Sequence, residues 1–127
     1  MRTLLLVEDD EDLRDVVSFA LRSDTRRVIE AEDGLAALDL IEAQGLPDLI
    51  LLDMNMPRMN GWEFARVMRE RDLWRCPVVV ITAAHDAARS AQEIGATAYL
   101  GKPFDLSSLS AVVDSCLARQ DETSAHV

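Results

Sequence analysis

The side chains best suited to chemistry stand directly after short apolar runs. One such run leads straight into Asp53, and another leads into the acidic stretch Glu8–Asp12. Two further runs end at Thr82 and just before Lys102. A short unbroken apolar run bounded by turn residues is typical of a strand buried on both faces of a parallel sheet. Carboxylates, a hydroxyl and an ammonium are therefore predicted at strand ends.

These groups together favour phosphoryl chemistry. Carboxylates from Glu8, Asp9 and Asp53 would repel one another if they converged, and a divalent cation would relieve that repulsion. Ligands that are all oxygen, with few carboxylates and retained water, favour Mg²⁺. A Mg²⁺ site of this kind usually accompanies a phosphoryl group. Asp53 is then the candidate nucleophile, forming an acyl phosphate, while Thr82 and Lys102 contact the other phosphoryl oxygens.

Strands and helices are expected to alternate along the whole chain. The predicted strands cover residues 3–7, 27–31, 49–53, 78–82 and 97–100, and amphipathic helices follow each of them. The helix after Thr82 is expected to be short, from about Ala87 to Glu93, and to stop at Gly95. The alternation predicts an α/β fold: a flavodoxin-like, doubly wound five-stranded parallel sheet in the order 2-1-3-4-5 with five helices. In that order the ends of the first, third, fourth and fifth strands meet at one edge.

Helix caps and apolar stripes in the sequence support this assignment of strands and helices. Asn60 and Glu63 have the spacing of a capping box, and Asp105 is placed to cap the last helix. Two helices carry apolar stripes that are predicted to face the sheet. The stripes consist of Leu13, Val16, Val17, Ala20 and Leu21 in the first helix and Leu106, Leu109, Val112, Val113 and Cys116 in the last. One domain is expected over residues 1–119, with a short polar C-terminal tail at 120–127.

Composition narrows the class of protein. The 127 residues suit one domain with a single core. A net charge of −10 argues against a nucleic-acid surface and favours a cation or a basic partner. No apolar run approaches a membrane span, and the start of the chain lacks a signal-peptide pattern. Cys76 and Cys116 lack metal-ligand spacing and are interpreted as reduced packing residues in a cytoplasmic protein.

Each candidate residue also has an ordinary structural role. An acidic run often lies at a solvated helix N-terminus, and Asp53 alone could begin an Asx turn before Pro57. Thr82 could simply end a strand, Lys102 could be a surface charge, and Tyr99 could be a core aromatic. Matching groups at four strand ends are much harder to explain by these separate roles. The combination therefore favours a shared site.

The chain resembles the receiver domain of the two-component response regulators, from about Met1 to Ala118. Each of the motifs is weak alone, but all of them occur in order at the expected separations. They are Val7-Glu8-Asp9-Asp10, Leu52-Asp53-Met54-Asn55-Met56-Pro57 with Met59-Asn60-Gly61, Ile81-Thr82-Ala83, and Tyr99-Leu100-Gly101-Lys102-Pro103-Phe104.

The resemblance implies a phosphoacceptor and a metal site. Asp53 would take a phosphoryl group from a sensor histidine kinase or a histidine phosphotransfer protein. Mg²⁺ would be bound by Asp9, Asp53 and the main-chain carbonyl of Asn55, with Glu8 acting through water. Lys102 would pair with Asp53 and then with its phosphoryl group.

The resemblance also implies how the signal is read. Thr82 and Tyr99 match the switch pair of the family, and the Lys102–Pro103 bond is expected to be cis. No output domain is expected after the last predicted helix, so output is expected through binding of another protein or onward transfer of the phosphoryl group. The protein is then a phosphorelay component that switches protein–protein interactions, rather than a turnover enzyme.

Three departures from the family pattern stand out. Glu8 occupies a position where Asp is also common, which lengthens one arm of the acidic pocket. Gly101 precedes Lys102 and is expected to loosen the loop that aims the ammonium. The segment from Thr82 to Gly95 is shorter than expected for the family, which predicts a short fourth helix on the usual output face.

Two alternatives from other classes remain. A haloacid-dehalogenase-type phosphohydrolase also has a nucleophilic Asp after a strand, but it needs a second Asp two residues later, where this chain has Asn55. A phosphorylation-independent, receiver-like binding module is the other alternative. The complete acid set, Thr82 and Lys102 argue against it.

Overall fold

The computed structural model describes the backbone of residues 1–125 and the side chains of residues 1–120. Five strands alternate with five helices, as the sequence predicts. The elements are β1 Arg2–Val7, α1 Glu11–Leu21, β2 Arg26–Ala31, α2 Gly34–Gln44, β3 Leu49–Asp53, α3 Gly61–Glu70, β4 Val78–Ala83, α4 Ala84–Ile94, β5 Ala98–Lys102 and α5 Leu106–Ala125.

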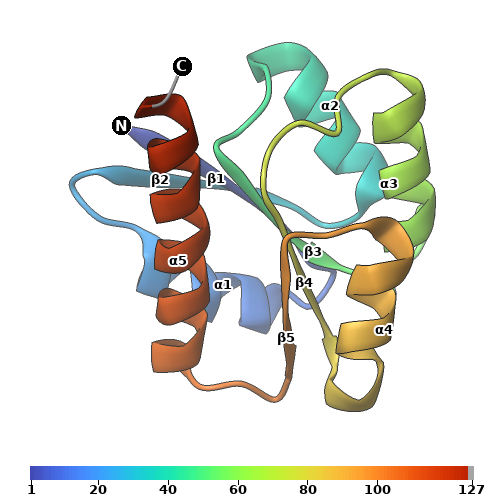
Figure 1. Cartoon of the computed structure of the whole chain (residues 1–127). Coiled ribbons are helices and arrows are strands. Elements are labelled where there is room, and N and C mark those ends of the chain that lie inside the picture. The colour runs from blue at the N-terminus through green and yellow to red at the C-terminus, as the bar shows by residue number, and fades with distance from the viewer. Residues whose placement is uncertain (126–127) are drawn as a thin grey trace.

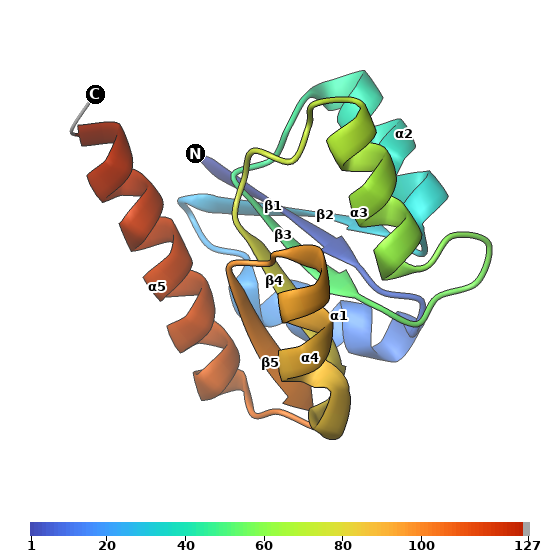
Figure 2. The same ribbon diagram turned by 45° about the vertical axis from the view of Figure 1, so that its right-hand side comes forward.

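The strands form one parallel sheet in the order β2-β1-β3-β4-β5, which confirms the predicted flavodoxin-like topology. Helices α1 and α5 cover one face of the sheet, and α2, α3 and α4 cover the other (Figure 1). The turned view separates these layers and shows β3 between the two helix layers (Figure 2). β3 is therefore the central strand. Its carboxyl end lies at the edge of the sheet beside that of β1, at the point where the strand order changes direction.

Alternate residues within each apolar run serve opposite faces of the sheet. In β3, Ile50 and Leu52 pack under α2, α3 and α4, whereas Leu49 and Leu51 pack under α1 and α5. Every residue of β3 is buried. Side chains of a strand alternate between faces, so a strand covered on both faces is mostly apolar. This explains the unbroken hydrophobic runs at residues 4–7, 49–52 and 78–81, whereas the edge strands β2 and β5 are less apolar and only partly buried.

Helix ends follow the predicted local chemistry. Asn60 and Glu63 form the capping box at the start of α3: the Glu63 amide donates to Asn60 Oδ1 at 2.9 Å, and the Asn60 amide donates to Glu63 Oε1 at 3.1 Å. The Ser108 amide donates to Asp105 at 2.7 Å, as expected for a cap of α5. Gly95 ends α4 in the left-handed conformation that suits glycine. The Lys102–Pro103 peptide bond is cis, as the resemblance implies.

The prediction of a short α4 is wrong. The helix covers Ala84–Ile94 and has 11 residues, as many as α1 and α2. It begins at the residue after the end of β4, so the shortness of this segment lies in the connection and not in the helix. Gly101 of β5 allows this close approach, because a Cβ at that position would lie 2.6 Å from the Cα of Ala84.

Two other details differ from the sequence predictions. Val16 of α1 and Leu106 of α5 are exposed, although both belong to the predicted inward stripes. Helix α5 continues to Ala125, so the polar tail predicted from residue 120 starts within the helix. Among the described residues, no helix combines the length and apolar character that crossing a bilayer requires.

Candidate functional site

The strand register brings the predicted residues to one place. Val7 of β1 pairs with Leu52 of β3, so the next residues, Glu8 and Asp53, lie side by side. Thr82 pairs with Gly101, which puts the Thr82 hydroxyl one strand away from Asp53 and next to the end of β5. These strand ends open into a cleft of about 680 Å³. Its lining residues are Glu8, Asp9, Asp10, Leu13, Asp53, Asn55, Thr82, Ala83, Lys102, Pro103 and Phe104.

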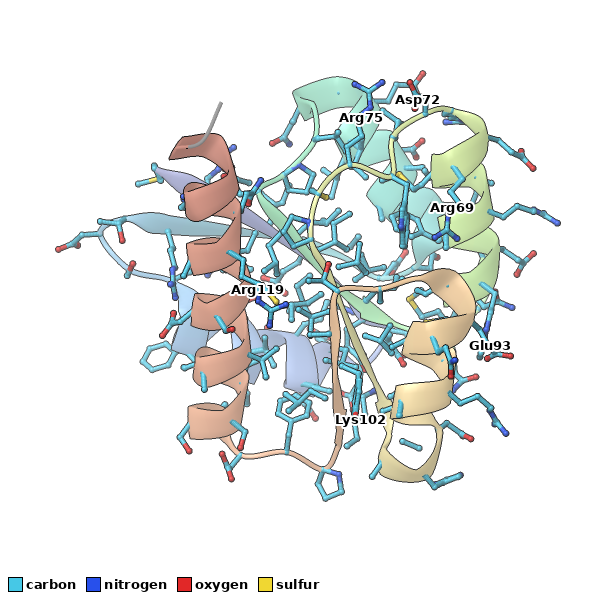
Figure 3. The ribbon with its side chains drawn as sticks, viewed as in Figure 1. Arg69, Asp72, Arg75, Glu93, Lys102 and Arg119 are labelled. Carbon is cyan, nitrogen blue, oxygen red and sulfur yellow. The ribbon has the colours of Figure 1, made fainter. Side chains whose placement is uncertain are left out.

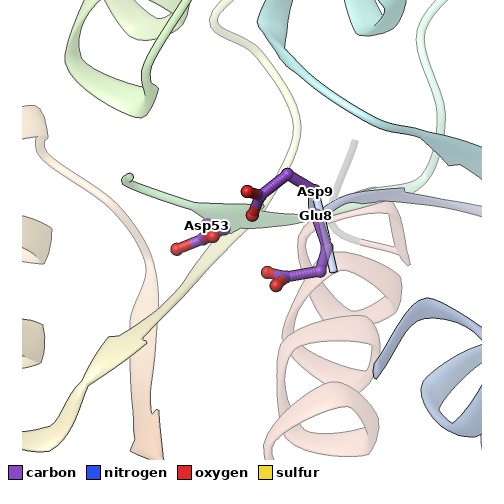
Figure 4. A group of neighbouring side chains, drawn as sticks. All are labelled: Glu8, Asp9 and Asp53. Atoms are coloured by element: carbon purple, nitrogen blue, oxygen red, sulfur yellow. The ribbon is translucent and has the colours of Figure 1, made fainter. Parts of the chain in front are cut away.

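Three carboxylates converge at the base of this cleft. Oxygen atoms of Glu8, Asp9 and Asp53 all lie within 4.8 Å of one another, and Figure 4 shows their side chains meeting at the end of β3. Glu8 is 0% exposed and Asp53 is 3% exposed, whereas Asp9 faces solvent. Burial of two negative charges at this spacing is unfavourable without a cation.

Lys102 supplies one positive charge. Its Nζ lies 3.0 Å from Oε1 and 3.1 Å from Oε2 of Glu8, and 3.5 Å from Oδ2 of Asp53. The side chain reaches the site from the end of β5, where Figure 3 labels it. The expected ion pair with Asp53 is present, but the two contacts with Glu8 are shorter. Glu8 has one more methylene than an Asp, so its carboxylate reaches the ammonium.

The electrostatics of the site follow from this arrangement. Burial, reinforced by the Asp53 charge and only partly opposed by Lys102, raises the pKa of Glu8 to about 7. Burial also raises the pKa of Asp53, although the charge of Lys102 works against it. For Lys102, burial opposes the ammonium, but the hydrogen bond to Glu8 and the Asp53 charge raise its pKa overall. If all three carboxylates were ionised, their charge would exceed that of Lys102, and the raised pKa values of Glu8 and Asp53 are the consequence of burial and of that repulsion.

Asn55 connects the acidic pocket to Thr82. Its backbone amide donates to Asp53 Oδ1 at 3.3 Å, and its side-chain amide Nδ2 donates to Thr82 Oγ1 at 3.3 Å. Thr82 is 1% exposed and Tyr99 is 51% exposed. Sequence reasoning selected Asn55 for its main-chain carbonyl alone. The side-chain contact with Thr82 was missed, because it joins positions far apart in the sequence.

Arg14 is another residue that sequence reasoning missed. Its Nη1 donates to the main-chain carbonyl of Glu8 at 2.7 Å, and its Nε lies 3.6 Å from Glu30 on β2. The guanidinium thus braces the turn that presents Glu8 and Asp9. The only signal in the sequence is a basic residue one turn into a helix that follows an acidic run.

The donor set fits Mg²⁺. The charged and polar groups that line the cleft are carboxylates, an amide, a hydroxyl and an ammonium, with neither thiolate nor imidazole among them. Oxygen ligands and excess negative charge favour a hard divalent cation. Asp9, Asp53 and Glu8 offer the carboxylates for such an ion.

Comparison with known proteins agrees with the fold. The sequence profile of the response regulator receiver domain matches residues 4–114. The chain is 38% identical over 128 residues to the KDP operon transcriptional regulatory protein KdpE of Escherichia coli, covering 98% of this chain and 55% of that protein. It is 36% identical over 119 residues to the response regulator Rcp1 of Synechocystis, covering 85% of this chain and 81% of that protein.

A solved structure shares the fold closely. A putative response regulator from Chloroflexus aurantiacus superposes with a TM-score of 0.82 at 32% identity, covering 92% of this chain and 98% of that one. The chain spans about half the length of the first curated relatives it matches, with 53% and 55% covered. Similarity to those relatives is therefore similarity to one part of each.

Proposed function

Because this chain belongs to the response regulator receiver domain family, we propose that Asp53 is its phosphoacceptor. The observation that carries the proposal is the position of Asp53 at the end of β3, where its carboxylate meets Asp9, Glu8 and Lys102. A carboxylate oxygen of Asp53 forms the bond to phosphorus while the phosphorus–nitrogen bond of a phosphohistidine breaks. The electron pair of that bond returns to the imidazole of the donor.

The neighbouring side chains have separate roles in this step. Lys102 already lies within 3.5 Å of Asp53 and provides a cation for the incoming phosphoryl oxygens. The Thr82 hydroxyl accepts a hydrogen bond from Asn55 and is buried beside the acceptor, so it is available to donate to a phosphoryl oxygen. Preorganised donors of this kind stabilise charge without being reorganised during the reaction.

Mg²⁺ completes the proposed site. Asp9, Asp53 and the main-chain carbonyl of Asn55 would hold the ion, and Glu8 would contact it through water. The bound ion supplies positive charge that offsets the negative charge of the phosphoryl oxygens. The fit rests on the three converging carboxylates, whose charge when ionised exceeds the single charge of Lys102.

The proposed partners follow from this chemistry. The donor is a sensor histidine kinase or a histidine phosphotransfer protein, acting in the cytoplasm. The domain carries a net charge of −10 and is proposed to act on proteins, not on nucleic acid. Phosphorylation is proposed to switch a protein–protein interaction, so the chain is a signalling component and not an enzyme of general turnover. Thr82 and Tyr99 are the proposed switch pair.

The test is incubation with acetyl phosphate and MgCl₂, followed by intact-mass measurement and site mapping. Acetyl phosphate donates the phosphoryl group and leaves as acetate. Wild-type protein should gain the mass of one phosphoryl group at Asp53, and a chelator should prevent the gain. Asp53→Asn should abolish labelling, Asp9→Asn should raise the Mg²⁺ requirement, and the surface variant Asp12→Asn should behave as wild type. Robust labelling of Asp53→Asn would refute the proposal.

A further inference from the structure

An ion pair outside the acidic pocket joins the loop after β3 to the start of α2. Arg58 lies in this loop, residues 54–60, and its Nε donates to Asp33 Oδ2 at 2.6 Å. Nη2 of the same guanidinium lies 3.6 Å from Glu32. The pair joins segments 25 residues apart in the sequence.

The Asp33 carboxylate is buried, and both of its oxygens accept hydrogen bonds. Its side chain is 2% exposed, and its Oδ1 accepts from the Ala36 amide at 2.9 Å as the N-cap of α2. Burial opposes the charged form, yet the hydrogen bonds from Arg58 and the Ala36 amide hold the pKa of Asp33 below its ordinary value. The Arg58 side chain is 55% exposed, so the pair is buried only at its Asp33 end, which the Ala36 amide also holds in place. Arg58 therefore has a fixed place to bind.

The backbone at Arg58 needs this support. Its φ of 62° lies in the left-handed region, which non-glycine residues rarely adopt. Such a conformation persists where surrounding contacts enforce it. The Asp33–Arg58 pair is one of these contacts, because it fixes the side chain of the left-handed residue itself.

A second contact joins the same two segments. The Gly34 amide donates to the Met59 carbonyl at 3.2 Å. A Cβ at Gly34 would lie 2.7 Å from Cγ of Met59, so the loop lies directly on the helix start. The start of α2 therefore contacts the loop at Met59 as well as at Arg58.

The same loop carries part of the metal site. It begins directly after Asp53 and contains Asn55, whose amide donates to Asp53 Oδ1 at 3.3 Å. Asn55 lies three residues before Arg58 in the same short loop, between Asp53 and the left-handed turn. We propose that the Asp33–Arg58 pair positions the main-chain carbonyl of Asn55 for Mg²⁺. This inference rests on the proposed metal site, and Asp33 and Arg58 are positioning residues within it.

The test uses isothermal titration of the purified protein with MgCl₂ alone, without a phosphoryl donor. Arg58→Gly removes the guanidinium but keeps the left-handed turn accessible. Asp33→Asn removes the charge but keeps an N-cap oxygen for Ala36. Each variant should bind Mg²⁺ about 10-fold more weakly, no more than the loss of a group hydrogen-bonded to a metal ligand costs, because the pair acts through the loop and does not touch a ligand. Arg66→Ala, which breaks the exposed ion pair of Arg66 with Glu70, is the matched control and should bind Mg²⁺ as wild type does.

A double variant separates positioning from general destabilisation. If the pair acts as a unit, the double variant Arg58→Gly with Asp33→Asn should bind Mg²⁺ as weakly as either single variant. Thermal unfolding of all variants shows whether they are folded at the temperature of titration. Arg58→Lys, which keeps the charge but loses the planar donor fork, should fall between wild type and Arg58→Gly.

The outcomes separate this inference from the proposed function. Wild-type binding of Mg²⁺ together with unchanged affinity in folded Arg58→Gly or Arg58→Lys would overturn the inference and leave the proposed function standing. Fully additive losses in the double variant would also overturn it. Absence of Mg²⁺ binding by the wild type would overturn both.

Discussion

The Lys102 ammonium lies 3.0 Å from Glu8 Oε1 and 3.5 Å from Asp53 Oδ2, so its shorter contact is not with the proposed acceptor. Glu8 thereby holds the ammonium beside Asp53 while leaving the acceptor oxygen less tightly paired. A phosphoryl group on Asp53 would replace the longer contact and leave the bidentate contact with Glu8 intact. The longer acidic side chain at this position therefore adjusts the geometry of the pocket without opening it.

The first prediction concerns pH and Glu8. The pKa of Glu8 rises from 4.5 to about 7 in the folded protein. Between these two pH values the Glu8 carboxyl is protonated in the folded protein but ionised in the unfolded chain. This contribution to stability is fully present below the unfolded pKa and is lost as the pH rises through about 7.

Denaturant unfolding at several pH values, with divalent cations chelated, checks this expectation. Wild type should lose on the order of 3 kcal/mol of unfolding free energy over this range. Glu8→Gln has no carboxyl proton at this position, so its unfolding free energy should depend less on pH. An equal pH slope in wild type and Glu8→Gln would show that Glu8 is not the titrating group.

The second prediction concerns catalysis. The chain should not turn over small phosphomonoesters, because Asn55 stands where a dehalogenase-type enzyme needs a general acid and its amide has no acidic proton to transfer. The Asn55 amide is also engaged with Thr82. The measurement is release of phosphate from p-nitrophenyl phosphate in the presence of Mg²⁺. Multiple turnover that disappears in Asp53→Asn would favour a phosphohydrolase.

The third prediction concerns the signal route through α4. Arg69 of α3 lies 4.6 Å from the ring centroid of Trp74 and donates to the Ile94 carbonyl, while Trp62 Nε1 donates to Glu93 at 3.3 Å. Figure 3 labels Arg69 and Glu93. These contacts hold the C-terminal end of α4 against α3. Its N-terminal end is one residue, Ala83, away from Thr82 and has no side-chain cap among the described residues.

Phosphorylation should therefore slow hydrogen exchange in residues 83–101, most strongly in the first turns of α4. Couplings of this kind are typically about 1–3 kcal/mol, so populations should shift without refolding. Thr82→Ala should still be phosphorylated but lose the slowing, and Thr82→Ser, which keeps a hydroxyl, should retain it. If exchange changes only on another face, this output route is wrong.

The fourth prediction compares two glycines. Gly101→Ala places a Cβ 2.6 Å from the Ala84 backbone, so β5 and α4 must separate, at a cost of about 1–3 kcal/mol. Gly45→Ala meets nothing within 4 Å but is strained at φ 88°, at a cost of about 1 kcal/mol.

Chemical denaturation and labelling with acetyl phosphate distinguish the two variants. Both should lose stability, but only Gly101→Ala should also slow labelling, because Gly101 precedes Lys102. Equal labelling rates in the two variants would show that Gly101 has no part in aiming the ammonium.

The sequence predicts the sheet and the contents of the cleft, because both depend on local patterns. Unbroken apolar runs mark buried parallel strands, and a residue that directly follows such a run must lie at the carboxyl edge. Glu8, Asp53 and Thr82 could be assigned to one site on that basis. Lys102 and the family resemblance completed the set.

The remaining features depend on contacts between distant segments. The start of α4 has no capping residue at Ala83, so no local signal marks it and the helix was predicted too short. The closer approach of Lys102 to Glu8 depends on side-chain length within the assembled pocket. The Asp33–Arg58 pair joins a helix cap to a loop, and neither residue indicates its partner in the sequence.

The direct junction between β4 and α4 has a mechanical consequence. A connecting loop absorbs displacement, whereas a strand and a helix that share adjacent residues transmit it. Ala83 ends the strand and Ala84 begins the helix, so a displacement of Thr82 on phosphorylation would be passed to α4 without a loop to absorb it. Inserting a short flexible linker at this junction should leave a domain that accepts its phosphoryl group but no longer reports it. The absence of a loop between Ala83 and Ala84 would thus couple the acidic cleft to the surface of α4.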